Sequence, residues 1–236
     1  MKFFREFPDI GKPRVFPVIH VKDEEQAILN AKIAFESGAD GIFLINHNNW
    51  LVPFHITAEV LMEQIFLAVK SVFPEKWIGL NCLDMDFQTV LRKSPKEVSG
   101  LWNDNCGIDS SRASTIKNTM KKSAWRGLYF GGFAFKYQKP ISYAYLENLA
   151  NEARTFVDII TTSGIATGIS PDTSKMSKIK AGAGRYPVAI ASGITPENAA
   201  RFAEYAHAFL VATGISNDFY NLSGVKLKWL MREIGR

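Results

Sequence analysis

Residues 186–216 have the sequence YPVAIASGITPENAARFAEYAHAFLVATGIS, in which two short apolar runs each end at a glycine-containing turn. The first run covers residues 187–191 and precedes Ser192-Gly193, and the second covers residues 208–212 and precedes Thr213-Gly214. Between them, Thr195-Pro196-Glu197 is a typical helix start, with an N-cap, a proline at the first helical position and an acidic first turn. The stretch therefore predicts strand, turn, helix, strand and turn.

The rest of the chain repeats this alternation of strand and helix about every 25 to 30 residues, the length of one βα unit. The apolar runs show little alternation, which indicates strands covered on both faces. A doubly wound sheet would place a glycine-rich loop after the first strand, whereas here the glycine-rich turns follow the last three. We therefore predict a single (β/α)8 TIM barrel over residues 1–236. Its expected strands are 15–21, 42–45, 77–82, 101–106, 128–135, 157–162, 187–191 and 208–212.

Composition narrows the classes of function. The 28 basic residues against 23 acidic ones are dispersed, whereas nucleic-acid binders show a basic stripe with exposed aromatics. The two cysteines form no disulfide framework, and no run of about 18 apolar residues indicates a membrane span. We expect a cytoplasmic protein that binds a phosphorylated small molecule, without nucleic acid. The sequence leaves a homo-oligomer open.

Polar residues at the predicted strand ends are the candidates for chemistry, because barrel enzymes of this fold carry their sites at the carboxyl ends of the strands. Three are candidate catalytic residues. His20 can transfer protons, Lys136 can pair with an anion or act as an amine of lowered pKa, and Asp104 can join them in proton transfer. The alternatives are a hydrogen-bonded structural histidine and a surface lysine beside Tyr137. Candidate substrate-pocket residues are Asn46, His47, Asn81, Asn103 and Thr162.

The glycine-containing turns predict a phosphate site, because turns after neighbouring strands bring backbone N–H groups and hydroxyls around one volume. The loops after strands 7 and 8 are the usual phosphate site of a (β/α)8 barrel. Tight turns alone would explain the glycines, but not the hydroxyl beside each of them. Candidate phosphate-binding residues are Ser192, Gly193, Thr213, Gly214 and Ile215, with Gly164, Thr167 and Gly168 from the turn after strand 6.

Neither a metal nor a cofactor is predicted, because the sequence contains no motif with the spacing of metal ligands. It also contains no serine, histidine and acid with the spacing of a known catalytic motif. Asp84 and Asp86 with Asp104 could hold Mg²⁺, but helix capping is the favoured interpretation for these loop carboxylates. Cys82 and Cys106 are expected to be buried, unreactive thiols. His207 precedes strand 8 and is expected to be structural.

Residues 157–198 (VDIITTSGIATGIS…ASGITPEN) resemble the strand 6 to strand 7 region of the BtpA-like family. The N-terminal half is similar more loosely, through VIHV at 18–21, GADGIFLINH at 38–47 and WIGLNCL at 77–83, and Lys136 falls where the family has a lysine. The resemblance implies a TIM barrel of the ribulose-phosphate-binding type. Its implied roles are photosystem I biogenesis in phototrophs and nucleoside- or sugar-phosphate chemistry elsewhere. Ser163 departs from the family pattern, which has a glycine there.

Two classes of function remain. The first is an enzyme that isomerises, cleaves or acts at a glycosidic bond of a phosphorylated sugar or nucleotide. The second is a non-catalytic assembly or ligand-sensing factor with a retained phosphate pocket. Phosphoribosylanthranilate isomerases share the strand 7 pattern, but Ile19-His20 stands where that family has its catalytic cysteine, which argues against that activity.

Overall fold

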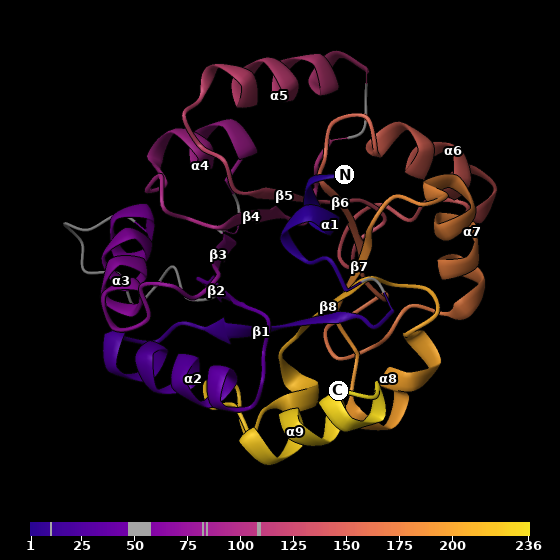
Figure 1. The fold of residues 1–236 in the computed structure, drawn as a ribbon. Coiled ribbons are helices and arrows are strands. Elements are labelled where there is room, and N and C mark those ends of the chain that lie inside the picture. Colours follow the sequence, from indigo (N-terminus) through magenta and orange to yellow (C-terminus); the bar gives the residue numbers. More distant parts are fainter. Residues whose placement is uncertain (10, 47–57, 82, 84, 108–109) are drawn as a thin grey trace.

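The chain forms a closed barrel of eight parallel strands, which confirms the predicted (β/α)8 architecture (Figure 1). A computed structural model describes residues 1–9, 11–46, 58–81, 83, 85–107 and 110–236. Each strand pairs with the next, and β8 pairs with β1 to close the barrel. The strands are β1 (Arg14–His20), β2 (Ile42–Ile45), β3 (Ile78–Asn81), β4 (Gly100–Asn103), β5 (Leu128–Gly132), β6 (Ile159–Thr162), β7 (Val188–Ala191) and β8 (Ala208–Val211).

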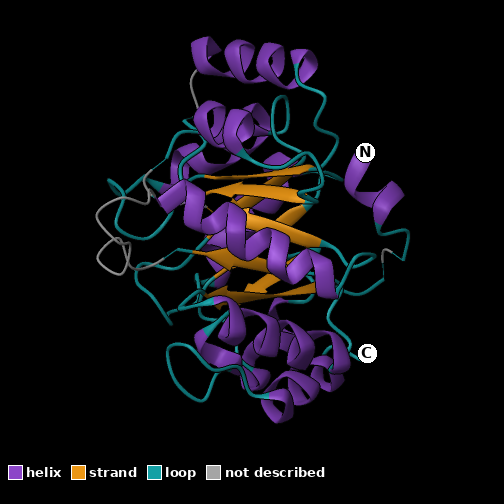
Figure 2. Ribbon diagram, turned by 90° about the vertical axis from the view of Figure 1, so that its left-hand side faces the viewer, coloured by secondary structure: helices purple, strands orange, loops and turns teal. Residues whose placement is uncertain are grey.

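The helices surround the strands in sequence order, and Figure 2 shows the strands enclosed between them. Side chains cap the helix starts: the Asp23 carboxylate accepts from the Gln26 N–H at 2.8 Å, and at Thr195, the expected N-cap, Asn198 Oδ1 accepts from the Thr195 N–H at 2.9 Å. The helices of the βα units are α2 (Glu24–Glu36), α3 (Ala58–Val72), α4 (Phe87–Lys93), α5 (Ser110–Lys122), α6 (Tyr143–Ala153), α7 (Thr173–Ala183), α8 (Pro196–Phe202) and α9 (Gly224–Glu233).

Aromatic side chains fill one side of the barrel interior. Phe16, Phe43 and Phe130 meet edge to face with ring centroids 5.1–6.0 Å apart, the arrangement that aromatic pairs prefer. Strands β7 and β8 contribute the small side chains of Ala189, Ala191 and Ala208 to the same interior. The large rings of β1, β2 and β5 are therefore accommodated opposite small residues.

A short helix that the sequence did not predict, α1 (Lys2–Glu6), closes the amino-terminal end of the barrel (Figures 1 and 2). Its Phe3 and the following Phe7 are buried in the same cluster as the interior aromatics, and Phe7 meets Phe16 at 5.5 Å. The Trp77 indole donates to Glu6 at 2.6 Å. Five residues are too few for a helix to be stable in isolation, so contacts with the barrel hold α1 in place.

Strand β5 is shorter than predicted, which corrects the position of Lys136. The prediction extended the strand to Phe135, but it ends at Gly132, and Lys136 lies four residues further on in the β5–α6 loop. A Cβ on Gly132 would lie 2.4 Å from the Asp104 carbonyl, so the chain at this point runs against the β4–α5 loop. Ala134 and Tyr137 then adopt positive φ angles of 51° and 62°, which turn the loop away from the strand direction.

Pro17, a residue type normally excluded from the interior of a strand, is accommodated inside β1. It is the last residue of β1 that is in register with β8, and Val18 is the first in register with β2. The stagger of the barrel therefore places the proline where the strand changes its pairing partner, so its missing N–H costs little.

Candidate functional site

A cavity of about 460 Å³ opens at the carboxyl ends of strands β2 to β5. This volume lies within the range of small-molecule sites in proteins. Five of the predicted site residues line it: Asn81, Asn103, Asp104, Lys136 and Thr167. The other described lining residues are Ile45, Leu83, Met85, Trp102, Asn105, Tyr137 and Gln138. We call this space the mouth cavity.

Two buried polar groups of β4 and β6 have no hydrogen-bond partner among the described residues. They are the indole nitrogen of Trp102, which lines the cavity, and the hydroxyl of Thr161, which is fully buried. A buried polar group without a partner costs free energy, and in both residues the polar atom itself is buried. Sequence reasoning missed Trp102 because a tryptophan in an apolar strand normally indicates core packing.

Strand alternation separates Thr161 from the predicted pocket residue Thr162. Thr161 is in register with Gly132 and with Ala189, whose side chain lies in the barrel interior. Thr162 is one residue further and faces the helices, and its hydroxyl donates to the Phe133 carbonyl at 3.1 Å. Thr162 therefore anchors the β5–α6 loop and does not line the mouth cavity. The inward-facing threonine is its neighbour.

The amide side chains of the mouth mostly organise loops. Asn81 donates to the Asp104 carboxylate at 3.2 Å, and Asn103 donates to the Met85 carbonyl at 2.9 Å. Asn46 accepts from the Leu83 N–H at 3.0 Å. These bonds hold the loops after β3 and β4, and the Asn81 bond orients the Asp104 carboxylate at the cavity wall.

His20 ends β1 beneath the loop that leads into α9. Its Nδ1 lies 2.9 Å from the Phe219 carbonyl, and the two rings stack at 4.2 Å. A carbonyl only accepts, so Nδ1 carries the proton and Nε2 is the basic nitrogen of the neutral ring. His20 is buried and is not among the described residues that line the mouth cavity.

Lys136 links the mouth cavity to the turn after β6. Its amino group donates to the Thr167 hydroxyl at 3.2 Å, and the Tyr137 hydroxyl lies 3.1 Å from the same oxygen. The Lys136 N–H donates to Ser163 at 2.8 Å. Hydrogen bonding from Thr167 lowers the pKa of the exposed Tyr137 phenol. One cation and one phenol therefore meet at Thr167, beside Gly168.

The three predicted phosphate turns converge. The Gly168 N–H donates to the Ser192 hydroxyl at 3.3 Å, and a Cβ on Gly168 would lie 3.9 Å from the Thr213 hydroxyl. Thr213 begins a short 3-10 helix, η1 (Thr213–Ile215), which the sequence did not predict. In the part of the chain that the structure describes, the N–H groups of Gly193, Thr213 and Gly214 form no hydrogen bond. These turns offer donors to an anion, whereas the Gly168 N–H is already used.

The glycines of these turns also have a packing role. A Cβ on Gly193 would lie 2.0 Å from the Ser170 nitrogen, and one on Gly214 would lie 2.0 Å from the Ile194 carbonyl oxygen. A Cβ on Gly164 would lie 2.0 Å from the Ile169 carbonyl oxygen, so Gly164 closes its own loop. The backbones of the three turns are thus in direct contact. This contact is possible because the glycines have no side chain.

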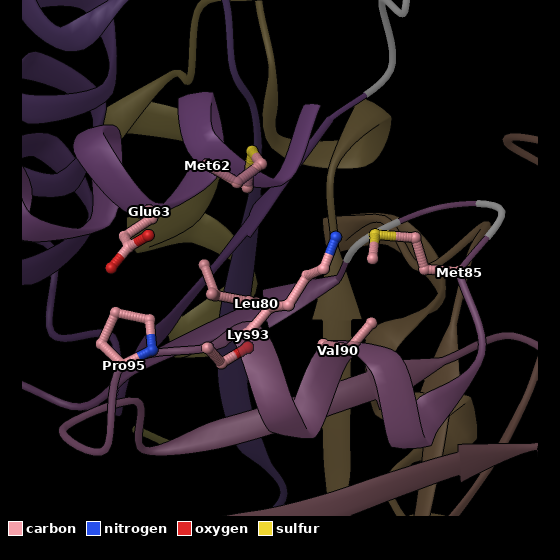
Figure 3. A pocket seen from close by; sticks show the side chains of 8 residues that line it. Met62, Glu63, Leu80, Met85, Val90, Lys93 and Pro95 are labelled. Carbon is pink, nitrogen blue, oxygen red and sulfur yellow. The ribbon is translucent and has the colours of Figure 1, made fainter. Parts of the chain in front are cut away.

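A depression between α3 and α4 is too small for a metabolite (Figure 3). Met62 and Glu63 on α3 face Val90 and Lys93 on α4 across about 10 Å³ of space, which is room for about one water molecule. We assign it a packing role.

The remaining predicted residues divide as follows. Asp86 caps α4, accepting from the Gln88 and Thr89 N–H groups at 3.0 Å, as the capping interpretation expected. Cys106 is buried, and burial raises the pKa of its thiol to about 12. His207 lies at the amino-terminal end of the barrel, against Phe4, where burial lowers its pKa. His47, Cys82 and Asp84 lie outside the described residues.

Over the described ranges, no three His, Cys, Asp or Glu side chains group closely enough to hold a metal ion. Within the same ranges, no helix is both long and apolar enough to cross a bilayer.

Comparison with solved structures finds the same TIM barrel fold in other proteins. It resembles tryptophan synthase subunit alpha from Legionella pneumophila str. Paris, with a TM-score of 0.70 and 14% identity over 99% of this chain and 98% of that one. It also resembles phosphoribosyl anthranilate isomerase from Thermus thermophilus, with a TM-score of 0.64 and 16% identity over 93% and 97% of the two chains.

A third similar structure contains a phosphorylated ligand. It is (S)-3-O-geranylgeranylglyceryl phosphate synthase from Thermoplasma acidophilum in complex with sn-glycerol-1-phosphate, with a TM-score of 0.66 and 12% identity over 98% and 96% of the two chains. At these identities the likeness establishes the fold alone. No family model and no curated protein matches the sequence.

Proposed function

We propose that this protein is an enzyme that acts on a phosphorylated sugar or nucleotide. The phosphate would bind at the turns 167–168, 192–193 and 213–215, and the rest of the ligand would extend into the mouth cavity. The observation that carries the proposal is that Lys136 and Asp104 both line the mouth cavity, while the Lys136 amino group also contacts Thr167 in the turn after β6. We further propose membership of the BtpA-like family, on the motif at 157–198.

The roles follow from the geometry. Lys136 supplies a cation between the cavity and the phosphate turns, through its contact with Thr167. Asp104, oriented by Asn81, is the proton acceptor in the cavity wall. Asn81, Trp102 and Asn103 line the space in which the sugar would lie. These assignments suit isomerisation or cleavage at a carbon that bears hydroxyl groups.

One observation favours a non-catalytic ligand-binding role as the second candidate. His20 is covered by the stacked Phe219 ring and does not join the described lining of the mouth cavity. A binding protein needs the phosphate turns and the cavity, but not an accessible histidine.

Binding and turnover of ribose 5-phosphate and of nucleoside monophosphates separate the two candidates. We expect ribose 5-phosphate to raise the Tm, and the variants Lys136→Ala and Asp104→Ala to lose turnover of any ligand that is consumed. Lys228→Ala, an exposed lysine on α9, is the control for Lys136. Binding without turnover of any tested ligand would leave only the second candidate. Absence of binding to all of them would contradict the phosphate site itself.

A further inference from the structure

A second cavity lies on the flank of the barrel, between the β5–α6 loop and the β6–α7 loop. Its volume is about 380 Å³, and its described lining is mainly apolar. Apolar members include Phe135, Ile141, Leu146, Ile165, Ile169 and Pro171. We call it the flank cavity. Among the residues that the structure describes, it shares only Tyr137 and Gln138 with the mouth cavity, so these two residues form the wall between the two spaces.

Lys175, in the first turn of α7, is a buried cation in the wall of this cavity. Its amino group donates to the Ser163 carbonyl at 2.6 Å and to the Ala134 carbonyl. An ammonium group has three donors, so one N–H remains after these two bonds. No carboxylate in the described part of the chain forms an ion pair with it.

Asp172 is the carboxylate that opposes the effect of burial on the pKa of Lys175. Asp172 is exposed. One of its carboxylate oxygens accepts from the backbone N–H of Lys175 at 2.9 Å, and the other accepts from the Tyr143 hydroxyl. Burial lowers the pKa of Lys175 to about 8, with Asp172 opposing that shift. Burying a charge without a partner costs free energy, which an anion in the cavity would offset. The exposed Lys139 at the rim adds a second positive charge.

The rim of the flank cavity is apolar and exposed. Ile165 is 80% exposed, Tyr137 79% and Ile169 48%, although side chains of this kind are normally covered. Burial of their surface by a ligand would stabilise a complex in proportion to the apolar area covered. The cavity therefore offers a buried cation at its wall and an apolar surface at its entrance.

We propose that the flank cavity is a second binding site, for a small organic acid with an apolar body whose carboxylate pairs with Lys175. The site is distinct from the phosphate turns and the mouth cavity, and its occupancy does not require turnover there. The volume of about 380 Å³ accommodates a bicyclic aromatic acid.

Isothermal titration with 2-naphthoate and with its uncharged analogue 2-naphthamide tests the proposal. We expect the carboxylate to bind at least about tenfold more tightly than the amide, because only the carboxylate compensates the buried ammonium. In Lys175→Met, this preference should disappear. Equal affinity of the two probes for the unmodified protein, or a preference that survives in Lys175→Met, would overturn the proposal.

Rim variants keep the test decisive if Lys175→Met does not fold. Ile165→Glu places a like charge at the entrance and should weaken 2-naphthoate binding severalfold. Val225→Glu changes an equally exposed residue of α9, 80% exposed, and should leave it unchanged. Lys136→Met alters only the mouth cavity and should also have no effect. Loss of 2-naphthoate binding in Lys136→Met would place the probe in the mouth cavity and overturn the assignment.

Discussion

Two adjacent threonines of β6 show how one residue of register changes the meaning of a side chain. Thr161 and Thr162 are both fully buried, but only the Thr162 hydroxyl has a hydrogen-bond partner in the described part of the chain. The sequence TT cannot distinguish them, because a strand covered on both faces carries no alternation of polar and apolar residues. The distinction comes only from pairing with the neighbouring strands.

The two threonines predict opposite effects of the same substitution. Thr161→Val removes a buried hydroxyl without a partner and should raise the free energy of unfolding, by up to about 1 kcal/mol. Thr162→Val leaves the Phe133 carbonyl without its donor and should lower it by about 1 kcal/mol. Urea unfolding of both variants measures the difference. Equal changes of the same sign would mean that the Thr161 hydroxyl has an unrecognised partner.

Lys2, Glu6 and Asp158 form a cluster of ionisable groups at the amino-terminal end of the barrel, and we expect it to make the free energy of unfolding depend on pH. Burial raises the pKa of Asp158 and of Glu6, and Lys2, 3.9 Å from Asp158, only partly opposes this for Asp158. A carboxyl whose folded pKa is raised contributes stability below its unfolded pKa, and that stability is lost as the pH rises through the folded pKa.

Asp158→Asn should remove the part of this dependence that belongs to Asp158. The amide oxygen can still accept from the Tyr129 N–H, which now donates to Asp158 at 2.9 Å. We expect the free energy of unfolding of the variant, relative to the unmodified protein, to rise between pH 4 and pH 7. Chemical unfolding at several pH values measures it. A relative stability that stays constant or falls over this range would contradict the raised pKa.

The turns after β6, β7 and β8 rest on close backbone contact, and their glycines differ in what they permit. Gly168 and Gly193 both have positive φ angles, 78° and 70°. A Cβ on Gly168 would meet nothing closer than 3.9 Å, whereas one on Gly193 would meet the backbone of Ser170 at 2.0 Å. Conformational strain acts at both positions, and a steric clash only at the second.

We therefore expect Gly193→Ala to destabilise the protein more than Gly168→Ala. The strain alone costs about 1 to 2 kcal/mol, and the clash at Gly193 adds to it. Gly11→Ala, at an exposed position where a Cβ meets nothing closer than 3.7 Å, is the control. Thermal unfolding ranks the three variants. A Gly193→Ala variant as stable as Gly168→Ala would show that the β6–α7 loop can move away from the turn.

The order of elements was predictable, and their ends were less so. Apolar runs and helix caps such as Asp23 and Thr195 located the eight strands and their helices. The predicted end of β5 was wrong, because the strand ends where Gly132 approaches the Asp104 carbonyl, and this contact joins segments that are distant in the sequence. The convergence of the phosphate turns could be expected from the fold, because loops that follow neighbouring strands lie side by side. The Trp102 nitrogen, which has no partner among the described residues, could not be expected in the same way.

Because α1 closes the barrel end, we expect its packing to contribute to the stability of the entire fold. Phe3 is 2% exposed and belongs to the cluster inside the barrel. Phe3→Ala should lower the free energy of unfolding by about 3 kcal/mol or more, because it leaves a cavity in a packed interior. Leu29→Ala, a residue of α2 that is 53% exposed, should change it by less than about 0.5 kcal/mol. Similar losses in both variants would show that α1 is only loosely attached.

The position of α1 at the start of the barrel sequence has a consequence for folding during synthesis. α1 is synthesised before β1, yet the cluster that buries Phe3 and Phe7 also contains rings from β1, β2 and β5 and from Trp77. Its aromatic face therefore has no complete docking surface until residue 130 has left the ribosome. During that interval the nascent chain exposes several phenylalanines at once, a surface of the kind that chaperones bind. Moving α1 to the carboxyl end by circular permutation would shorten this interval, and should improve soluble yield in cells with limited chaperone capacity.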